Sequence, residues 1–518
     1  MHEAWQGKHK VFAATVACAC SCRARLWVDN QAVFIPQINM TAPLDIVVMA
    51  AGKGTRMKSR HPKVLQKLAG RALLQHVLDT AAQLKARSAV VVTGHGAAEV
   101  EAAIAAANGA DGAHGAMDLK FVRQEPQLGT GHAVQQAVPA LKDDGLVVVL
   151  SGDVPLTRAD TLQGLLDAAG SDKMALLTVT MADPTGYGRI VRNDAGTVQR
   201  IVEQKDASEA ERAITEIYSG IMAVPARHLT AWLAKLDNNN AQGEYYLTDI
   251  VAMAVADGVP VVGHRIADAL QVAGVNSPLQ LAELERAHQL RQARELMAQG
   301  VRMADPARFD LRDDARGAKA SLSCGQDVEI DVNCIFAGKV TIGAGARIGA
   351  NCHLSNVSIA DDAVIHPFTH IDGEKAGVEV GQGALVGPFA RLRPGARLGR
   401  EVHIGNFVEV KNSTLADGAK ANHLAYLGDA TVGERVNYGA GSITANYDGV
   451  NKHRTVIEAD VHIGSNCVLV APVTIAAGGT VGGGSTVTKN TEAGALTVGR
   501  GRQVSIRNWK RPEKLPKA

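Results

Sequence analysis

The chain has 518 residues, too many for one hydrophobic core, so we expect two or more domains. Its 54 Lys and Arg residues nearly balance 52 Asp and Glu residues, so the bulk charge predicts no general attraction to nucleic acid or an anionic membrane. No apolar run in the sequence reaches the length of a membrane span. Any phosphate binding must therefore depend on local groups.

Residues 1–40 differ in composition from the rest of the chain. A basic start, a short apolar segment and Cys18, Cys20 and Cys22 give an outline that a signal peptide or a metal site could share. Because the apolar segment is short and no fourth ligand is nearby, we expect an extension that is disordered or results from an upstream start assignment. The seven cysteines show no disulfide-framework spacing, which favours a reducing cytoplasm.

Residues 41–276 alternate between short Val- and Leu-rich segments and Ala-rich helical segments. This alternation predicts a Rossmann-like α/β domain with a mostly parallel sheet and helices on both faces. Ligands bind such a sheet at the carboxyl ends of its strands. The expected strands cover residues 45–50, 88–94, 119–124, 145–153 and 174–181.

A glycine-rich basic loop follows the first expected strand. It is not a P-loop, because Gly52 and Gly54 flank Lys53, and it lacks the dinucleotide fingerprint, because Met57 stands where a third glycine is needed. The amides of the two glycines, with Lys53 and the later Lys63, could still hold phosphate. A solvated turn is the alternative for the loop taken alone.

Two further segments favour nucleotide chemistry. Gly129 and Thr130 lie in a turn whose amide and hydroxyl groups suit the edge of a base, and Asp153 ends an apolar strand, where it could coordinate a hard cation. An aspartate in that place caps a helix more often than it binds metal. The basic loop earlier in the same sheet favours the metal.

The hydrophobic period changes after a predicted connecting helix at residues 277–300. Within residues 301–500, aliphatic residues recur every six positions, which fits a parallel β-helix in which each hexad supplies one strand and one turn. We expect loops at the breaks, residues 372–379 and 445–455, and little contact between this prism and the α/β domain beyond the helix. The in-phase positions are Ile330, Phe336, Ile342, Ile348 and Leu354; Val380, Val386, Leu392, Leu398, Ile404 and Val410; and Ile463, Leu469, Ile475, Val481 and Val487.

A family resemblance covers nearly everything after Met40. The chain resembles the bifunctional bacterial N-acetylglucosamine-1-phosphate uridylyltransferase/glucosamine-1-phosphate acetyltransferases in the motifs AAGKGTRM, PKVL, QLGTGHA, GDVPL, PTGYGRIV, NNNAQGEYYLTDI and GVN and in the hexapeptide repeats. The resemblance implies an α/β nucleotidyltransferase domain followed by a left-handed parallel β-helix. It also implies a cytoplasmic homotrimer assembled through the β-helices, with Mg²⁺ as cofactor and no nucleic-acid or membrane partner.

The implied function has two steps. Acetyl transfer from acetyl-CoA to glucosamine 1-phosphate gives N-acetylglucosamine 1-phosphate. Uridylyl transfer from UTP then gives UDP-N-acetylglucosamine for cell-envelope synthesis and releases pyrophosphate. Two rivals stay open: a nucleotidyltransferase whose β-helix only oligomerises it, and a regulatory scaffold of the same build. The set of residues around His423 argues against the first, and the joint presence of Lys63, Asp153, Asn276 and His423 argues against the second.

The resemblance implies roles for residues of the first domain. Asp153 and Asn276 would hold Mg²⁺, and Lys63 would contact phosphate. Ser151 stands where many members of the family have Tyr, and Tyr218 where many have Asn, which leaves the contacts of the sugar pocket open. The substrate-binding residues expected in this domain are Met49, Ala50, Ala51 and Gly52 along the nucleotide; Lys63; Gln124, Gly129 and Thr130 at uracil; Ser151, Gly152 and Asp153; Gly188, Glu203 and Tyr218 at the sugar; and Asn276.

The β-helix carries a second expected site. A lone His in a turn is more often inert, but His423 resembles the general base that deprotonates the glucosamine amine for attack on the acetyl-CoA thioester. Gly483 stands where relatives often have Ala. The basic tail, residues 501–518, is either solvated or helps to grip coenzyme A phosphates from a neighbouring subunit. The expected sugar-phosphate ligands are Arg393, Lys411, Tyr426 and Asn437, and the expected acetyl-CoA contacts are Ala440, Asn446, Tyr447, Ser465, Gly483 and Arg500.

Overall fold

The computed structural model describes residues 43–111 and 117–511. The expected extension at residues 1–40 and the last seven residues of the basic tail lie outside this range. None of the described helices is long and apolar enough to cross a membrane.

The first part of the described chain is built on a nine-stranded sheet in the order β11-β7-β10-β6-β1-β4-β5, with β8 paired to β10 and β9 paired to β8. All five strands expected from the Val- and Leu-rich segments are present. Four of the six neighbour pairs along this seven-strand order run parallel, whereas β10 is antiparallel to β6, β7 and β8, and β8 is antiparallel to β9. The strands are β1 (Leu44–Met49), β4 (Ser88–Thr93), β5 (Asp118–Arg123), β6 (Leu146–Ser151), β7 (Met174–Thr180), β8 (Gly188–Arg192), β9 (Val198–Val202), β10 (Glu216–Pro225) and β11 (Val261–Ile266).

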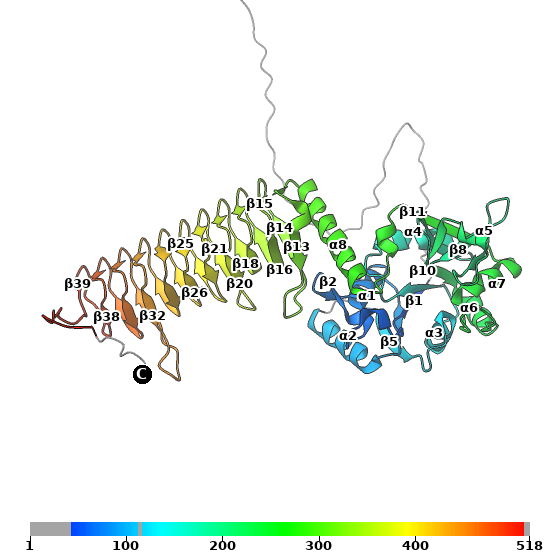
Figure 1. Ribbon diagram of the computed structural model, residues 1–518, viewed down its shortest axis with the longest axis horizontal. Helices are drawn as coiled ribbons and strands as arrows, with labels where there is room; N and C mark the ends of the chain where they lie inside the picture. Colours follow the sequence, from blue (N-terminus) through cyan, green and yellow to red (C-terminus); the bar gives the residue numbers. More distant parts are fainter. Residues whose placement is uncertain (1–42, 112–116, 512–518) are drawn as a thin grey trace, which may run out of the picture. The chain divides into compact units, whose positions relative to one another are not determined.

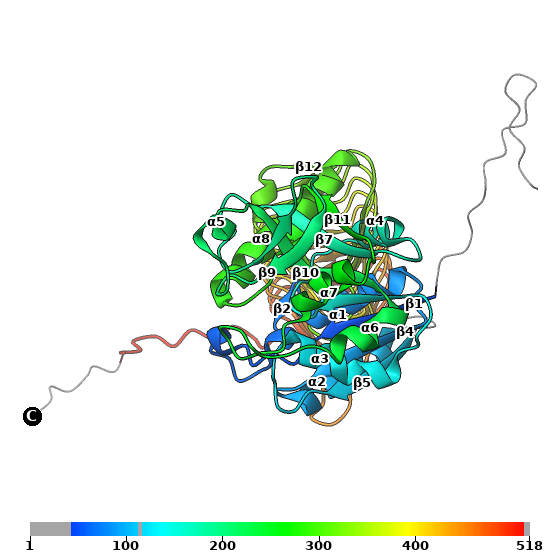
Figure 2. The ribbon, with the colours of Figure 1, turned by 90° about the vertical axis from the view of Figure 1, so that its right-hand side faces the viewer.

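Helices cover both faces of this sheet (Figure 2). The first buried cluster joins the strands to α1 (Leu73–Gln83), α2 (Ala97–Asp111) and α4 (Ala159–Ala169), and the second joins them to α3 (Thr130–Ala137), α6 (Ala226–Leu233) and α7 (Ile250–Ala256). Successive strand residues point to opposite faces, so Ile46 and Val48 belong to the first cluster and Val47 to the second. Two covered faces explain why these strands are apolar throughout.

Helix α8 (Pro278–Ala298) leads from the α/β part into the β-helix (Figure 1). The Ser277 side chain accepts a 3.2 Å hydrogen bond from the Gln280 amide and so caps the helix. From β12 (Arg302–Met303) to β39 (Leu496–Thr497), short strands stack in parallel into long sheets. All the in-phase residues of the hexads, which are aliphatic except for Phe336, are buried in one continuous core, which confirms the predicted parallel β-helix.

Both predicted breaks are loops. One lies between β20 (His370–Asp372) and β21 (Val378–Val380), and the other lies between β32 (Ile443–Ala445) and β33 (Thr455–Ile457). The second loop is closed by an antiparallel bridge between Tyr447 and Lys452.

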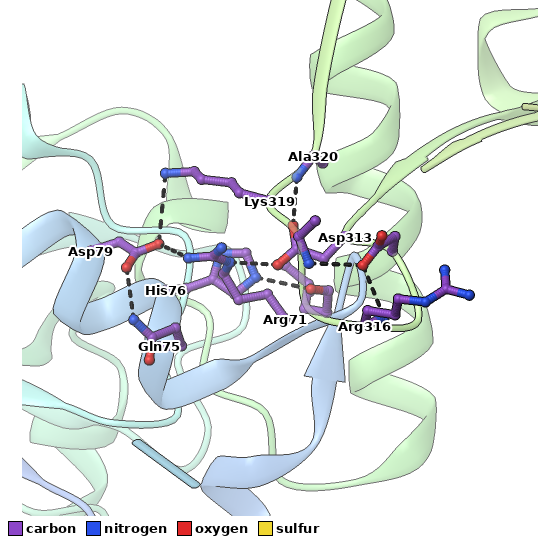
Figure 3. Close-up of polar contacts among 11 residues, drawn as sticks. Arg71, Gln75, His76, Asp79, Asp313, Arg316, Lys319 and Ala320 are labelled. Carbon is purple, nitrogen blue, oxygen red and sulfur yellow. Dashed lines mark hydrogen bonds and ion pairs between the residues drawn. The ribbon is translucent and has the colours of Figure 1, made fainter. Parts of the chain in front are cut away.

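The expectation of little contact between the α/β part and the β-helix was wrong. The turn of the hairpin β2 (Lys67–Leu68)–β3 (Arg71–Ala72) reaches the start of the β-helix, where the Asp313 amide donates a 2.9 Å hydrogen bond to the Ala69 carbonyl. The Arg71 side chain is only 7% exposed and pairs with Asp79 of α1 and with Asp313 (Figure 3). A buried guanidinium needs such partners, but 242 residues separate Arg71 from Asp313, so no local pattern reveals the pair.

Candidate active sites

The first candidate site lies at the carboxyl ends of β1 and β6, which are neighbours in the sheet. Met49 pairs with Ser151, and the Gly152 amide donates a 2.9 Å hydrogen bond to the Met49 carbonyl. The segments Met49–Gly52 and Ser151–Asp153 therefore lie side by side, as the topology of a parallel sheet predicts.

Lys63 joins this edge to the segment before α8. Its ammonium forms an ion pair with the Asp153 carboxylate and donates a 3.1 Å hydrogen bond to Oδ1 of Asn276. Asn276 is held in place because the Val275 amide donates a 3.0 Å hydrogen bond to the Asp153 carbonyl. Gly54, with φ of +57°, makes room for the lysine, since a Cβ there would lie 2.6 Å from the Lys63 Cβ.

The same oxygen atoms fit a hard cation. The Asp153 carboxylate and the Asn276 amide oxygen converge on one positive charge, which the Lys63 ammonium provides in this structure. Across residues 43–111 and 117–511, no three His, Cys, Asp or Glu side chains gather into a metal-binding cluster. A carboxylate and an amide suit Mg²⁺, which takes most of its other ligands from water and substrate phosphates.

A second group, expected at uracil, lies next to the end of β5. The buried Gln124 amide nitrogen donates a 2.9 Å hydrogen bond to the Gly129 carbonyl. Thr130, the first residue of α3, accepts a 3.1 Å hydrogen bond from the Leu247 amide. Gln124, Gly129 and Thr130 are thus brought together at one edge of the sheet.

A third group, expected at the sugar, comprises Gly188 of β8, Tyr218 of β10 and Glu203, which directly follows β9. Tyr218 pairs with Gly188, and a Cβ at Gly188 would lie 3.7 Å from both carboxylate oxygens of Glu203 and 2.8 Å from Ile201. Thr248 donates a 3.0 Å hydrogen bond to Glu203 Oε1. Burial raises the pKa of the Glu203 carboxyl, and the bond from Thr248 opposes this in part.

The second candidate site lies on the outside of the β-helix. Strands β26 (Glu409–Lys411) and β29 (Tyr426–Gly428) follow each other on successive coils, and Glu409 pairs with Tyr426. The Glu409 carboxylate accepts a 2.8 Å hydrogen bond from the Arg393 guanidinium on the preceding coil. Arg393, Lys411 and Tyr426 therefore form one outward-facing group.

His423 ends β28 (Lys420–His423), three residues before Tyr426 of this group, and its side chain is exposed. Its Nδ1 is 2.9 Å from Oδ1 of Asn406, which ends β25 (His403–Asn406) and occupies the matching position one coil earlier. Since an amide oxygen only accepts hydrogen bonds, Nδ1 carries the proton. The lone pair of Nε2 is then available to accept a proton.

Two lysines face each other beside this group. The adjacent Lys452 ammonium lowers the pKa of Lys411, and burial and the charge of Arg393 act in the same direction. Lys452 belongs to the loop that Tyr447 closes. A concentration of like charge of this kind suits a phosphate ligand.

The residues expected at acetyl-CoA lie on successive coils. The Ala440 carbonyl accepts a 2.8 Å hydrogen bond from the backbone amide of the residue after Ser465. In the same way, the Ser465 carbonyl accepts a 2.8 Å hydrogen bond from the amide of the residue after Gly483. The Arg500 side chain donates a 2.6 Å hydrogen bond to the Gly483 carbonyl. Asn446 is buried against Asp429, and Tyr447 is exposed in the loop. Asn437, in β31 (Asn437–Tyr438), pairs with Lys420 of the His423 strand.

Three residues of these sites were missed from the sequence. The sequence around Thr248 contains no pattern that predicts its hydrogen bond to Glu203. Lys452 lies in a loop whose basic character was visible, and Asn406 lies 17 residues before His423, which is one coil of the β-helix. The coil length could have identified Asn406.

Comparisons with known proteins agree with this architecture. The MobA-like NTP transferase domain family matches residues 46–302. The bifunctional protein GlmU of Acidovorax ebreus (strain TPSY) is 77% identical over 479 residues, covering 92% of this chain and all of that protein. This chain belongs to the GlmU family. GlmU of Paracidovorax citrulli (strain AAC00-1) is 77% identical over 92% of this chain and 99% of its own length, and GlmU of Herminiimonas arsenicoxydans is 54% identical over 92% of this chain and all of its own length.

The MobA-like match runs from within β1 to the end of α8, so it includes Lys63, Asp153 and Asn276, and it ends where the β-helix begins.

Proposed function

We propose that this GlmU protein acetylates glucosamine 1-phosphate with acetyl-CoA and then uridylylates the N-acetylglucosamine 1-phosphate formed, in the synthesis of UDP-N-acetylglucosamine. The observation that carries the proposal is the presence of two separately assembled sites, one around Lys63, Asp153 and Asn276 and one around His423 and Lys411. Neither an inert scaffold nor a single-activity enzyme needs both. We assign uridylyl transfer to residues 41–276 and acetyl transfer to residues 301–500, joined by the helix at 277–300.

In the uridylyl transfer, a phosphate oxygen of the sugar attacks the α-phosphorus of UTP and pyrophosphate leaves. The protein needs no nucleophile, so its contribution is alignment and charge neutralisation. Lys63 neutralises the phosphates, the amides of Ala51 and Gly52 approach them, and Glu203 binds the sugar. Gln124, Gly129 and Thr130 read uracil.

Mg²⁺ is the cofactor that the donor set favours. Asp153 and Asn276 would hold it, and the bound ion would neutralise part of the phosphate charge. In this proposal, the Lys63 ammonium moves from the oxygens of Asp153 and Asn276 to the nucleotide phosphates.

In the acetyl transfer, the amine of glucosamine 1-phosphate attacks the thioester carbonyl of acetyl-CoA. Nε2 of His423 removes a proton from the amine, the C–S bond breaks, and coenzyme A leaves as its thiol after taking up a proton. The Asn406 oxygen keeps the proton of the imidazole on Nδ1 throughout. Arg393 and Lys411 bind the sugar phosphate with Tyr426 and Asn437, and the row from Ala440 to Arg500 binds acetyl-CoA together with Asn446 and Tyr447.

We also propose that the protein acts as a homotrimer joined through its β-helices. Phe368, Phe389 and Phe407 stack along one corner of the β-helix, with ring centroids 4.9 Å and 5.4 Å apart. All three remain about half exposed, and Leu424 continues the row at 61% exposed. A stacked apolar row of this size is typical of a protein interface. Sedimentation of wild type beside Phe389→Ser tests this: the variant should dissociate, and an unchanged trimer would contradict the assignment.

The function is tested by incubating the full chain with glucosamine 1-phosphate, acetyl-CoA, UTP and Mg²⁺ and omitting each in turn. Thiol release should need only glucosamine 1-phosphate and acetyl-CoA, whereas pyrophosphate release should need all four components. Supplied N-acetylglucosamine 1-phosphate should replace the first two. Thiol release without pyrophosphate release, or the reverse, would reduce the proposal to a single activity.

A further inference from the structure

Two imidazoles meet on the outside of the β-helix, in coils that precede the acetyl-transfer residues. His353 begins β18 (His353–Ile359) and pairs with His370, which begins β20 on the next coil. The next residue of each strand, Leu354 or Ile371, is buried in the core, so both imidazoles point outward. Their Nδ1 atoms are 3.3 Å apart, and the ring centroids are 4.8 Å apart.

The pair shares one proton between its two Nδ1 atoms. A neutral imidazole carries its proton on one nitrogen and a lone pair on the other, so one Nδ1 donates the hydrogen bond and the other accepts it. Burial lowers the pKa of both imidazoles; the charge of Arg312 acts in the same direction on His353 and that of Arg391 on His370, whereas Asp372 opposes both. Both rings are therefore neutral at pH 7, and neutral imidazole is the form that binds metal ions.

The charges around the pair do not exclude a cation. Arg312 and Arg391 each pair with a carboxylate, Asp310 at 2.8 Å and Glu409 at 3.3 Å. Asp372 ends β20, and its only ion pair within the described part of the chain is a long one of 3.8 Å. Its negative charge is therefore left largely uncompensated near the two imidazoles.

We propose that His353 and His370 are the protein ligands of a tetrahedral divalent transition-metal site, with Zn²⁺ as its ion. In tetrahedral zinc sites the Zn–N bonds measure about 2.0–2.1 Å, which places two ligand nitrogens about 3.3–3.4 Å apart. The Nδ1 atoms of the pair already have this separation. Water fills the two remaining positions, so the site is open, unlike a closed structural zinc site with four protein ligands.

Metal binding at this pair releases no net proton. The proton on the donating Nδ1 moves to Nε2 of the same ring, so that both Nδ1 lone pairs face the ion and both Nε2–H groups donate to water. Nitrogen ligands favour Zn²⁺ and Co²⁺ over Mg²⁺, which prefers oxygen. The site is therefore independent of the Mg²⁺ proposed at Asp153, and it joins two neighbouring coils only when the β-helix is folded.

The test titrates the full chain with Co²⁺, a spectroscopic substitute for Zn²⁺, in excess Mg²⁺. Cys18→Ser, Cys20→Ser and Cys22→Ser are present in every sample, because these thiolates could bind the same ions. Four-coordinate Co²⁺ absorbs visible light more strongly than six-coordinate Co²⁺, so an intense band should appear, saturate at one ion per chain and disappear when Zn²⁺ is added. His353→Gln and His370→Gln should each weaken binding by at least about 10–100-fold, the loss that even an outer-shell partner causes.

His403→Gln is the matched control, because it removes a partly buried imidazole of the same β-helix that does not belong to the pair. Its affinity for Co²⁺ should stay within about 2-fold of the parent chain. Without metal, all three variants should keep both activities within about 2-fold of the parent, which shows that they fold. Zn²⁺ should raise the melting temperature of the parent and of His403→Gln but not of the two pair variants, since an ion that binds only the folded chain stabilises it.

Each outcome decides the proposal. If the Co²⁺ spectrum is that of a six-coordinate ion, or if the two pair variants bind as tightly as His403→Gln, the site is absent and the pair is only a hydrogen bond between two coils. If a pair variant fails to fold, His353→Asn or His370→Asn replaces it. A crystal soaked in Zn²⁺ adds an independent readout: an anomalous peak within bonding distance of both Nδ1 atoms supports the site, and an unchanged hydrogen bond between the Nδ1 atoms overturns it.

Discussion

In the α/β part, Lys63 lies 90 residues from Asp153 and 213 residues from Asn276 in the sequence, yet all three meet at one edge of the sheet. In the β-helix, Asn406 and His423 are 17 residues apart and occupy the same position on neighbouring coils. The first site is built from residues that are far apart in the sequence and are brought together by the fold. The second is built from equivalent positions on neighbouring coils. The two sites should therefore fail in different ways, and variants can separate them.

The largest effect is expected from Asp153→Ala. It removes the carboxylate that faces Lys63 and Asn276, so the proposed cation loses its charged protein ligand and the phosphates lose a fixed positive charge. Pyrophosphate release should fall by about 10³-fold or more. Thiol release from acetyl-CoA should persist. Asp160→Ala, at an exposed ion pair seven positions further on, is the control and should keep both activities.

His423→Ala is the reciprocal test. A positioned base contributes about 10²–10⁴-fold, so acetylation should fall by that factor while uridylylation of supplied N-acetylglucosamine 1-phosphate is unchanged. His403→Ala, one coil earlier, controls for loss of an imidazole from the β-helix. Parallel loss of both activities would mean that His423 supports the structure, and the separation of the two sites would fail.

The Arg71→Met variant tests how far the contact between the α/β part and the β-helix contributes to stability. It leaves the carboxylates of Asp79 and Asp313 without their buried guanidinium, which should lower the free energy of unfolding by about 3 kcal/mol. Arg302→Met, at an ion pair whose partners are 64% and 45% exposed, should lower it by less than about 1 kcal/mol. Calorimetry gives both values. If both variants lost the same free energy of unfolding, the contact at Arg71 would add no stability, and the two regions would be independent as first expected.

Within a single pH unit, the smallest effect is a pH dependence at the same junction. Burial lowers the pKa of His288 from 6.5 to about 3, with His76 and Arg291 acting in the same direction. Between these values the unfolded chain binds the extra proton, so the free energy of unfolding should fall as the pH drops from about 6.5 towards 3, by at most about 1.4 kcal/mol per pH unit. His288→Gln should flatten this slope in urea unfolding measured at several pH values. An unaltered slope would place the acid sensitivity elsewhere.

The local periods of the sequence predicted most of the fold. Val- and Leu-rich segments predicted the central strands, and the six-residue repeat predicted the β-helix, because both depend on neighbours in the chain. The position of Asp153 just after β6 followed from the predicted strand, whereas the approach of Lys63 to it did not. The Arg71–Asp313 pair did not, since 242 residues separate two charges that look like ordinary surface groups. The burial of Glu203 and Tyr218 was equally hidden, because it depends on how β8, β9 and β10 pack.

The distance between neighbouring coils of the β-helix is fixed by the hydrogen bonds between their strands. Neighbouring strands lie about 4.8 Å apart, so groups on successive coils, such as Asn406 and His423, have a separation set by the backbone ladder. Single substitutions therefore cannot increase the separation between these groups in small steps. A new ligand can be accommodated only by exchanging a side chain on one coil, by reshaping the loop that Tyr447 and Lys452 close, or by adding a whole coil. Homologues with altered acyl or sugar preference should therefore differ in loop length or in steps of about 18 residues, the separation of Arg391 and Glu409 on neighbouring coils.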